Sequence, residues 1–442
     1  MKILSVDYHA ASLDWLMRCK EDGHRVKIFS TDPKTIRVGE NMVDRIDDFR
    51  EWLRWADVVF VADNVKWLRD LDAARKDGVP IFGPTAEMAQ LELDRDEGMK
   101  LFRKHDIPTI KTTEFNDYDK AIDFVKSTMG RYVSKPSGDA DKALSYCSKS
   151  PEDMVFMLER WKRLGKLKSP FILQEFKPGV EMAVGAWVGK NGFASVWCEN
   201  FEFKKLMDGD MGVATGEQGT VLRYVKTSKL ARKVLAPLEG FLVKNGYIGY
   251  IDVNCIIDDE GRPWPLEFTC RPGWPTFNIQ QVLHVGDHAE WMVDLLEGRD
   301  PKCWTPNTVV MGVVLSIPDY PYSRVPREDV QNIPIYGITP SLRENIHPLE
   351  VMLQPAPHQV GGKIIDLPTL VTAGDYVLVA TGEGSSVREA KHQAYRILKR
   401  LSLPNSPMYR TDIGDRLKTQ LDDLQKNGYA MGLVYRPIDL TA

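Results

Sequence analysis

The residues best suited to chemistry lie in one acidic segment, GYIGYIDVNCIIDDEGRPWPLEFTCRPG, at positions 246–273. Its alternating apolar and polar residues predict two strands, Tyr250–Ile257 and Pro263–Thr269, joined by an Asp-Asp-Glu-Gly turn. With the turn centred on these four residues, Asp252 is expected directly opposite Glu267. Two carboxylates opposed on apolar strands repel each other unless a cation lies between them.

The same face of this hairpin is expected to carry further polar groups. Because side chains alternate along a strand, Asn254 shares the face of Asp252, and Thr269 shares the face of Glu267. Carboxylate oxygens suit Mg²⁺, which takes one or two carboxylates together with phosphate oxygens. Arg271 follows on that face and adds a fixed positive charge for a phosphoryl group. The alternative is a solvent-facing hairpin with ordinary charges, because a register shift of one residue would turn Asp252 to the other side.

The elements before this hairpin begin with an alternation of short apolar runs and amphipathic segments over residues 1–82. MKILSVD, HRVKIFS, ADVVFVAD and VPIFG are predicted strands, and SLDWLMRCKEDG and KWLRDLDAARKDG are predicted helices. This pattern predicts a parallel sheet with helices on its faces, in a Rossmann-like N-terminal domain at 1–82. The turn Asp7–Ser12 after the first strand has no glycine, which disfavours an NAD-dependent oxidoreductase.

Residues 83–300 are expected to form a second, mixed α+β domain in which antiparallel hairpins join helices. No G-x-x-x-x-G-K-[ST] sequence occurs in the chain, so a P-loop is excluded as the nucleotide site. After a proline-rich stretch at 301–360, a strand pair leads into a helix whose first residues, Ser386–Glu389, have the capping-box sequence. We therefore predict a mostly β C-terminal domain at 301–442, within a multidomain α/β and α+β protein.

Composition excludes several classes of protein. The 442 residues are 43% hydrophobic and 27% charged, with a net charge of −4, which indicates a globular protein without a basic surface for nucleic acid. The six cysteines are far apart and lack metal-ligand spacing, as expected of free thiols in a reducing compartment. His284 and His288 lack the glutamate of a zinc-binding helix, so ordinary surface or core positions are the better interpretation. Without a signal peptide or a membrane-spanning run, we expect a cytoplasmic monomer or homodimer.

Several segments resemble glycinamide ribonucleotide synthetases, the phosphoribosylamine–glycine ligases, in the order in which that family has them. GPTAEMAQLELDRDEGMKLFRKHDIPT resembles the start of their ATP-grasp fold, RYVSKPSGDADKALS their phosphate-covering loop, and FILQEFKPGVEMAVGAWVGKNG the segment that holds adenosine. GDMGVATGEQGTV is similar to their Gly-Met-Gly loop, PWPLEFTCRPGWPTFN to their metal-binding strand, and DYVLVATGEGSSVREAKHQAYRIL with MYRTDIG to their closing strand, helix and tail. The resemblance implies a pre-ATP-grasp domain at 1–82, an ATP-grasp domain at 83–300 with a lid at about 108–178, and a C-terminal domain with a returning tail.

The resemblance implies ATP and Mg²⁺ as cofactors. The residues that it implies for nucleotide binding are Arg95, Lys135, Lys142, Glu175, Phe176 and Glu181. The cations would contact phosphates, Glu175–Phe176 would form a backbone hinge for adenine, and Glu181 would accept the ribose hydroxyls. Arg95 replaces the family's first nucleotide lysine, and Ala143 stands beside Lys142 where the family usually has glycine.

The resemblance also gives roles to the acidic hairpin. Asp252 and Glu267 become metal ligands, and Arg271 becomes a clamp on the transferred phosphoryl group. Thr269 stands where the family has a metal-binding asparagine. Because a hydroxyl is a poorer ligand than an amide oxygen, Mg²⁺ would be held through water or more loosely.

The implied reaction joins a carboxylate to an amine in two steps. The carboxylate attacks the γ-phosphate of ATP to give an acyl phosphate, and the amine then displaces phosphate to form an amide. The loop from Asp210 to Gly212, with Thr215–Glu217 after it, is implied to line the carboxylate pocket, and glycine is the first candidate for the acid. Two alternatives stay open: the same ligation on another amine, such as a modified nucleotide, and a degenerate nucleotide-binding protein without turnover.

One part of the family pattern is missing at the expected amine pocket. The family has a G-G-R-E-H turn after its first strand, whose backbone amides help to seat a sugar phosphate. This chain has Val6–Ser12 there, which is expected to place the Asp7 carboxylate and the Tyr8 ring at the pocket mouth and to repel a phosphate. The family's later proline-containing loop is replaced by Ala62–Trp67. We therefore predict that acyl activation is kept while phosphoribosylamine is not the preferred amine.

Overall fold

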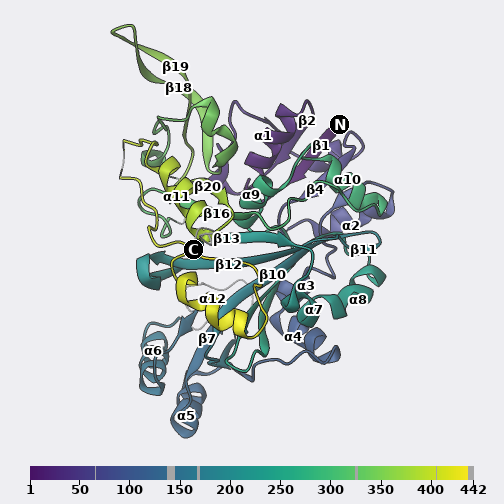
Figure 1. The fold of residues 1–442 in the computed structure, drawn as a ribbon, viewed down its shortest axis with the longest axis vertical. Coiled ribbons are helices and arrows are strands. Elements are labelled where there is room, and N and C mark those ends of the chain that lie inside the picture. Colours follow the sequence, from purple (N-terminus) through teal and green to yellow (C-terminus); the bar gives the residue numbers. More distant parts are fainter. Residues whose placement is uncertain (65, 137–144, 167–169, 324–326, 405, 437–442) are drawn as a thin grey trace, which may run out of the picture.

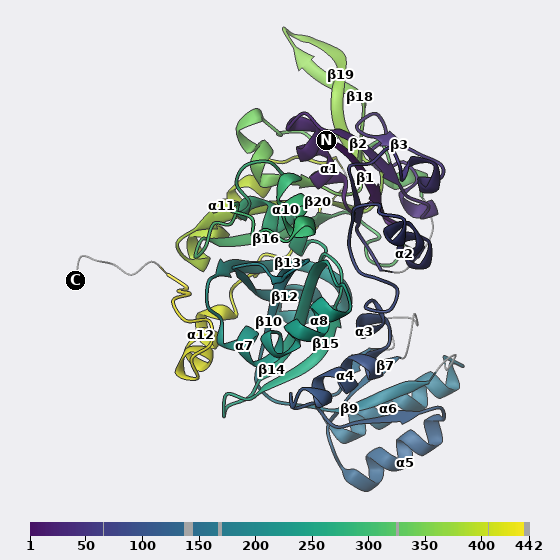
Figure 2. The ribbon, with the colours of Figure 1, turned by 90° about the vertical axis from the view of Figure 1, so that its right-hand side faces the viewer.

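The computed structural model describes residues 1–64, 66–136, 145–166, 170–323, 327–404 and 406–436. Their strands form sheets of five, nine, four and two strands. In Figures 1 and 2 the five-stranded N-terminal sheet and the two-stranded arm lie near the top, and the four-stranded sheet with its helices lies at the bottom. The nine-stranded sheet connects these two ends, so the segments implied to hold nucleotide meet around it.

The N-terminal sheet is parallel throughout, as the alternating pattern predicts. Its order is β3 (Asp44–Arg45), β2 (Arg25–Phe29), β1 (Lys2–Val6), β4 (Val58–Val61) and β5 (Ile81–Phe82). Helices α1 (Leu13–Glu21) and α2 (Leu68–Lys76) follow β1 and β4. Each helix has an acidic residue in its first turn and basic residues in its last turn, which complements the helix dipole. The short strand β3 was not predicted.

The nine-stranded sheet forms the body of the molecule. Its main path is β15 (Pro263–Thr269), β14 (Gly249–Ile257), β10 (Val180–Gly189), β12 (Trp197–Met207), β13 (Met211–Val225), β16 (Val309–Ser316), β20 (Tyr376–Gly384) and β17 (Ile346–Pro348), with β11 (Gly192–Phe193) paired to β10. The strands after residue 300 thus extend the same sheet, because the second half of the long strand β13 pairs with β16. The domain boundaries at 82 and 300 stay predictions.

The four-stranded sheet, which we call the lid sheet, is antiparallel and has its own apolar core. Its order is β6 (Thr112–Phe115), β9 (Phe171–Glu175), β7 (Tyr132–Pro136) and β8 (Tyr146–Cys147), and α5 (Tyr118–Thr128) and α6 (Pro151–Arg163) belong to the same unit. Phe115, Phe171 and Trp161 pack in one buried cluster with both helices. Ser150 caps α6, and Pro151 follows it at the first helical position.

The other helices lie around the nine-stranded sheet. They are α3 (Gln90–Leu93), α4 (Arg95–Lys104), α7 (Lys229–Val234), α8 (Glu239–Lys244), α9 (Thr276–Gln280), α10 (Glu290–Glu297), α11 (Val387–Leu398) and α12 (Leu417–Lys426). β18 (Val351–Val360) and β19 (Lys363–Thr372) form the arm that projects at the top of Figure 2. At α11 the predicted capping box is half formed, because Ser386 accepts from the Glu389 N–H but the Glu389 carboxylate accepts from Ser385.

The predicted fold class is therefore confirmed: a parallel N-terminal α/β unit precedes large antiparallel sheets with helices. Among the residues that the structure describes, no helix combines the length and the apolar character needed to cross a bilayer. The largest buried apolar cluster contains residues of the nine-stranded sheet together with residues of α1, α4, α9 and α11. This shared core fixes α4 and the N-terminal unit against the strands that carry the acidic hairpin.

Candidate active site

A cavity of about 740 Å³ lies where α4 and the lid strand β7 approach strands β12 to β15. The predicted residues in its wall are Arg95, Lys135, Asp252, Glu267, Thr269 and Arg271. They come from α4, the lid sheet, the two strands of the acidic hairpin and the segment after it. The fold thus brings the predicted phosphate-binding cations and the predicted metal ligands to one site.

Glu267 lies among cations at one end of this cavity. Arg95, the first residue of α4, donates a hydrogen bond from Nη2 to Glu267 Oε2 at 2.6 Å. Burial alone would raise the pKa of the Glu267 carboxyl, but Lys135 and Lys204 outweigh it, and the pKa falls to about 2. Burial also lowers the pKa of the Lys135 ammonium to about 8, against the attraction of Glu267. With more cations than carboxylates, this end suits phosphate groups.

The hairpin has a different register from the predicted one. Asp252 pairs with Thr269, and Asn254 pairs with Glu267, so the prediction that the two carboxylates are directly opposed was wrong. The turn closes later than expected, and an irregularity after Asn254 shifts the register once more. Together the two shifts move the pairing by two residues. Asp252, Asn254, Glu267 and Thr269 therefore still share one face of the hairpin, as alternation predicts.

The oxygen atoms on this face fit a hard divalent cation. Asp252 accepts hydrogen bonds from Asn200 Nδ2 at 2.8 Å and from the Tyr250 hydroxyl at 3.2 Å. Burial and the nearby charge of Glu202 raise the pKa of Asp252 to about 7. Asn254 Oδ1 is buried without a hydrogen-bond partner among the described residues. Carboxylate and amide oxygens such as those of Asp252 and Asn254 are typical Mg²⁺ ligands.

Three charged residues of the cavity wall were not predicted from the sequence: Glu92, Glu202 and Lys204. Lys204 Nζ lies 3.2 Å from Glu181 Oε1 and 3.0 Å from Glu202 Oε2. Although burial would lower the pKa of the Lys204 ammonium, the charges of Glu202 and Glu181 raise it well above its usual value. Glu202 also accepts from Asn254 Nδ2 at 2.9 Å. For Glu202 and Lys204 the available signal was their spacing, since positions 202 and 204 alternate with the buried Phe203 and share one face of β12.

The predicted adenine hinge lies at the end of β9, where the chain leaves the lid sheet. The N–H of Glu175 donates to the Lys111 carbonyl at 3.0 Å, and the N–H of Phe176 donates to the Arg131 carbonyl at 2.9 Å. The Arg131 guanidinium lies 3.4 Å from the centroid of the Phe176 ring. Both N–H groups thus have partners within the fold, and their role toward adenine stays a prediction.

The structure does not place Asp210 and Gly212 in the cavity wall. Asp210 Oδ1 accepts a hydrogen bond from Arg410 Nη1 at 2.9 Å, because the turn between β12 and β13 is tied to the C-terminal tail. The side chain of Arg410 is almost fully buried and also pairs with Asp412. Farther along β13, residues 214–217 do line the cavity. Of the segment predicted to line the carboxylate pocket, the cavity wall thus contains the second half only, and the role of that half toward a carboxylate stays a prediction.

Arg271 lies in the cavity wall but is tied to a neighbouring acid. Its Nη2 lies 3.3 Å from Glu92 Oε1, while Glu92 Oε2 accepts hydrogen bonds from the Cys270 N–H and from Asn64 Nδ2. Glu92 therefore links the segment after β15 to the loop after β4. Lys142, the weaker nucleotide candidate, lies outside the described residues.

The turn after β1 differs from the expectation for Asp7. Its carboxylate is fully buried and does not face the pocket mouth. It accepts hydrogen bonds from the Ser12 N–H at 2.7 Å, the Ser12 hydroxyl at 2.6 Å and the His9 N–H at 3.2 Å. The Asp63 carboxylate accepts from the Tyr8 N–H at 2.6 Å. These backbone N–H groups, which a glycine-rich turn would offer to a phosphate, are bonded to carboxylates of the protein.

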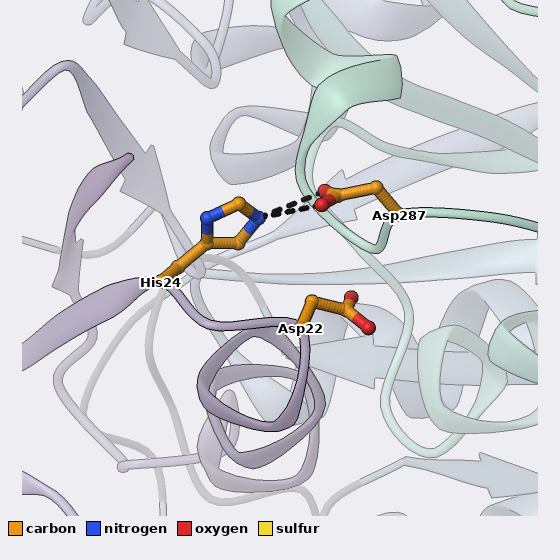
Figure 3. Close-up of side chains that lie close together, drawn as sticks. All are labelled: Asp22, His24 and Asp287. Atoms are coloured by element: carbon orange, nitrogen blue, oxygen red, sulfur yellow. Dashed lines mark hydrogen bonds and ion pairs between the residues drawn. The ribbon is translucent and has the colours of Figure 1, made fainter.

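A cluster with metal-ligand residue types joins the N-terminal unit to the segment before α10 (Figure 3). His24 Nε2 lies 2.9 and 2.8 Å from the two carboxylate oxygens of Asp287, and His24 Nδ1 lies 2.9 Å from the N-terminal ammonium. Asp22 bonds instead to His288 Nδ1 at 2.6 Å. These contacts satisfy the ring nitrogens of His24, so the cluster is explained as a contact between the two units.

Comparisons with known proteins bear on the resemblance seen in the sequence. Residues 98–276 match the family described as phosphoribosylglycinamide synthetase, ATP-grasp (A) domain. The phosphoribosylamine–glycine ligase of Neisseria meningitidis serogroup B is 28% identical over 370 residues, which cover 78% of this chain and 81% of that protein. The corresponding ligase of Vibrio vulnificus is 26% identical over 360 residues, covering 78% and 80%.

Solved structures show the same fold. The crystal structure of phosphoribosylamine–glycine ligase from Thermotoga maritima has a TM-score of 0.70 at 20% identity and covers 93% of this chain and 100% of that chain. The N5-carboxyaminoimidazole ribonucleotide synthetase of Thermotoga maritima has a TM-score of 0.58 at 14% identity, covering 92% and 99%. The chain is an ATP-grasp ligase similar to the phosphoribosylamine–glycine ligases. ATP and Mg²⁺, the predicted cofactors, are those of this enzyme class, and the biotin carboxylase domain of a Hydrogenobacter thermophilus carboxylase, another protein of this fold, was crystallised with MgADP.

Proposed function

We propose that this ligase activates a carboxylic acid with Mg-ATP and transfers the acyl group to an amine other than phosphoribosylamine. The main support is the distribution of charge in the wall of one cavity: Arg95 and Lys135 act on Glu267, whereas Glu202 and Asp252 act on Glu217. The transferred phosphoryl group would meet the cations beside Glu267, and the rest of the substrate would extend toward residues 214–217.

The residues predicted to bind ATP and Mg²⁺ have roles that their chemistry supports. Arg95 and Lys135 bind the phosphates of ATP, and Arg271 neutralises the transferred phosphoryl group. Glu181 accepts the ribose hydroxyls from its position beside Lys204. Asp252, Glu267 and Thr269 would hold Mg²⁺, which when bound neutralises charge that develops on the phosphate oxygens.

The chemical steps need no nucleophile from the protein. A carboxylate oxygen of the substrate attacks the γ-phosphorus, ADP leaves, and an acyl phosphate forms. The amine then attacks the acyl carbon, phosphate leaves, and the amine proton passes to solvent. The enzyme contributes position and charge neutralisation. Glycine is the first candidate for the acid, because the similar proteins are named for glycine ligation.

The choice of amine rests on the turn after β1. The N–H groups of Tyr8, His9 and Ser12 donate to the carboxylates of Asp63 and Asp7, so this turn offers little to a sugar phosphate. The Tyr8 ring supplies an aromatic surface at this turn. The Lys66 ammonium lies 3.6 Å from its centroid. A larger and less anionic amine, such as part of a modified nucleotide, suits these groups better.

Nucleotide analysis with a generic amine tests the ligation. Purified protein is incubated with Mg-ATP, hydroxylamine as the amine, and a panel of carboxylic acids that includes glycine. We expect ADP and a hydroxamate that depend on the acid, and a Lys135→Ala variant should bind Mg-ATP more weakly. Lys126→Ala, which removes an exposed lysine of α5 (59% exposed), is the matched control. AMP as the product, or no nucleotide binding in calorimetry, would contradict the proposal.

A further inference from the structure

Three carboxylates of the cavity wall act on one another, and one of them has an oxygen atom without a hydrogen-bond partner among the described residues. Glu202 pairs with Lys204 and accepts from Asn254 Nδ2, and Asp252 accepts from Asn200 and Tyr250. Glu217 accepts a hydrogen bond from the Thr276 hydroxyl through Oε2 at 3.4 Å.

Glu217 Oε1 has no hydrogen-bond partner among the described residues, although the residue is only 5% exposed. An unpaired buried carboxylate oxygen is costly, because it has lost its water without gaining a donor. Burial and the charge of Glu202 accordingly raise the pKa of Glu217 well above its usual value. The residue nevertheless lies in the cavity wall, where a ligand can reach it. This arrangement is suited to a cationic ligand group with several N–H donors.

The surroundings of Glu217 differ from those of the predicted metal and phosphate groups. Lys204 acts on both carboxylates, but the other charges that act on Glu267 are the cations Lys135 and Arg95, whereas those that act on Glu217 are the acids Glu202 and Asp252. Glu217 belongs to β13 and contacts Thr276 of α9, while Glu267 belongs to the edge strand β15. A substrate group beyond the transferred phosphoryl would therefore meet Glu217.

We propose that Glu217 is the counter-ion for a protonated amine on the carboxylate substrate, and that it makes this ligase selective for amino acids over simple acids. The inference rests on the proposed ligation and adds the residue that selects its acid. An ammonium group has three N–H donors, and Glu217 Oε1 is a buried acceptor in the cavity that lacks a partner within the described residues.

Matched acid pairs test this role. The pairs are glycine and acetate, β-alanine and propionate, and L-lysine and hexanoate, with hydroxylamine as the amine and ADP release as the readout. We expect at least one amino member to exceed its partner about tenfold or more in kcat/KM, as the loss of a charged hydrogen bond predicts. Glu217→Gln should raise KM for that amino acid about tenfold, with little change in kcat or in the KM for Mg-ATP.

A control variant and a Mg²⁺ titration make the outcome specific to Glu217. Glu383→Gln, on the exposed end of β20, should leave all constants unchanged. An unchanged preference for the amino acid in Glu217→Gln would overturn the proposal, as would equal rates with acids that lack an amine. A higher Mg²⁺ requirement in the variant would assign Glu217 to the metal instead.

Failure of the ligation itself gives a different pattern. If no acid of the panel stimulates ADP release while Mg-ATP still binds, the proposed function is contradicted. Glu217 is then judged by calorimetry with glycine and L-lysine in the presence of a non-hydrolysable ATP analogue. Binding that is lost in Glu217→Gln supports the site, and absence of binding to the natural protein overturns it.

Discussion

Arg95 Nη2 lies 2.6 Å from Glu267 Oε2, so the first residue of α4 is bonded directly to the strand that is predicted to bind the metal. Arg95 stands where the related ligases are expected to have a lysine. The longer, forked side chain reaches Glu267 and still presents N–H groups to the cavity. This contact holds α4, which carries the cation predicted to bind phosphate, against the carboxylate predicted to bind the metal.

Replacement of Glu267 by glutamine tests that carboxylate. Glu267→Gln keeps the shape of the side chain but removes the charge that balances Mg²⁺, so turnover should fall about a hundredfold or more. The stability of the fold should change by only about 1 kcal/mol or less, because both partners of the ion pair are partly exposed. ADP release and thermal unfolding measure the two effects. Glu260→Gln in the hairpin turn, 72% exposed, is the control, and near-normal turnover in Glu267→Gln would place the metal elsewhere.

Thr269 offers a gain-of-function test at the same site. Thr269→Asn supplies an amide oxygen, which is a better Mg²⁺ ligand than a hydroxyl. We expect the variant to keep its activity and to reach half-maximal rate at a lower Mg²⁺ concentration. Thr419→Asn, exposed on α12, is the matched control. A variant that needs more Mg²⁺ than the natural protein would show that Thr269 does not face the metal.

The sequence predicts the strands of the acidic hairpin to within one residue, but not their register. Apolar alternation defines Gly249–Ile257 and Pro263–Thr269, whereas the irregularity after Asn254 has no sequence signal. The face of Asp252 was nevertheless predicted correctly, because two shifts of one residue cancel for a side-chain period of two. The apolar alternation therefore predicts the strands and the face of each side chain, whereas the pairing of the two strands depends on the geometry of the turn.

The proximity of three carboxylates in the site was not predicted, because it depends on sheet order. Glu202, Glu217 and Asp252 come together because β12 lies between β10 and β13, with β10 in turn paired to β14. No local pattern in a single sequence reveals that order. Asp7 shows the same limit, since its burial depends on hydrogen bonds to its own turn that residue type alone does not predict. The resemblance to a family predicted the type of reaction. The structure shows that Asp7 and Asp210 lie elsewhere than predicted, Asp7 buried in its own turn and Asp210 beside Arg410.

His284 predicts a pH dependence of stability. Its ring is buried, and Trp187 Nε1 donates to the Tyr224 hydroxyl, which leaves the hydroxyl hydrogen for His284 Nε2. Burial lowers the pKa of His284 from 6.5 to about 3. Between these values the unfolded chain binds a proton that the folded protein excludes, so this contribution to stability is present above pH 6.5 and is lost as pH falls.

The comparison of two variants isolates this effect. From pH 6.5 to pH 4 the free energy of unfolding should fall more steeply in the natural protein than in His284→Gln, by up to about 1.4 kcal/mol per pH unit. His392→Gln, exposed on α11, should keep the natural slope. Denaturant unfolding at a series of pH values gives the slopes. Equal slopes in the natural protein and His284→Gln would show that the buried ring titrates in the folded state.

The turn after β1 predicts the outcome with phosphoribosylamine. Because carboxylates occupy the N–H groups of Tyr8, His9 and Ser12, we expect little glycinamide ribonucleotide when phosphoribosylamine is generated in place and glycine is supplied. A coupled assay that detects the product by mass spectrometry makes the measurement, with hydroxylamine as the positive control for acyl activation. Product formation at rates typical of metabolic enzymes would show that the replaced turn is a variant of the same phosphate site.

Oxygen transfer from the acid distinguishes an acyl phosphate from an acyl adenylate. The acid that supports ADP release is labelled with ¹⁸O in its carboxylate and turned over with Mg-ATP and hydroxylamine. Attack of a carboxylate oxygen on the γ-phosphate predicts one labelled oxygen in each phosphate released and none in the nucleotide, as mass spectrometry would show. Label in AMP, or unlabelled phosphate from a reaction that forms the hydroxamate, would contradict an acyl phosphate and with it the account of this ligase.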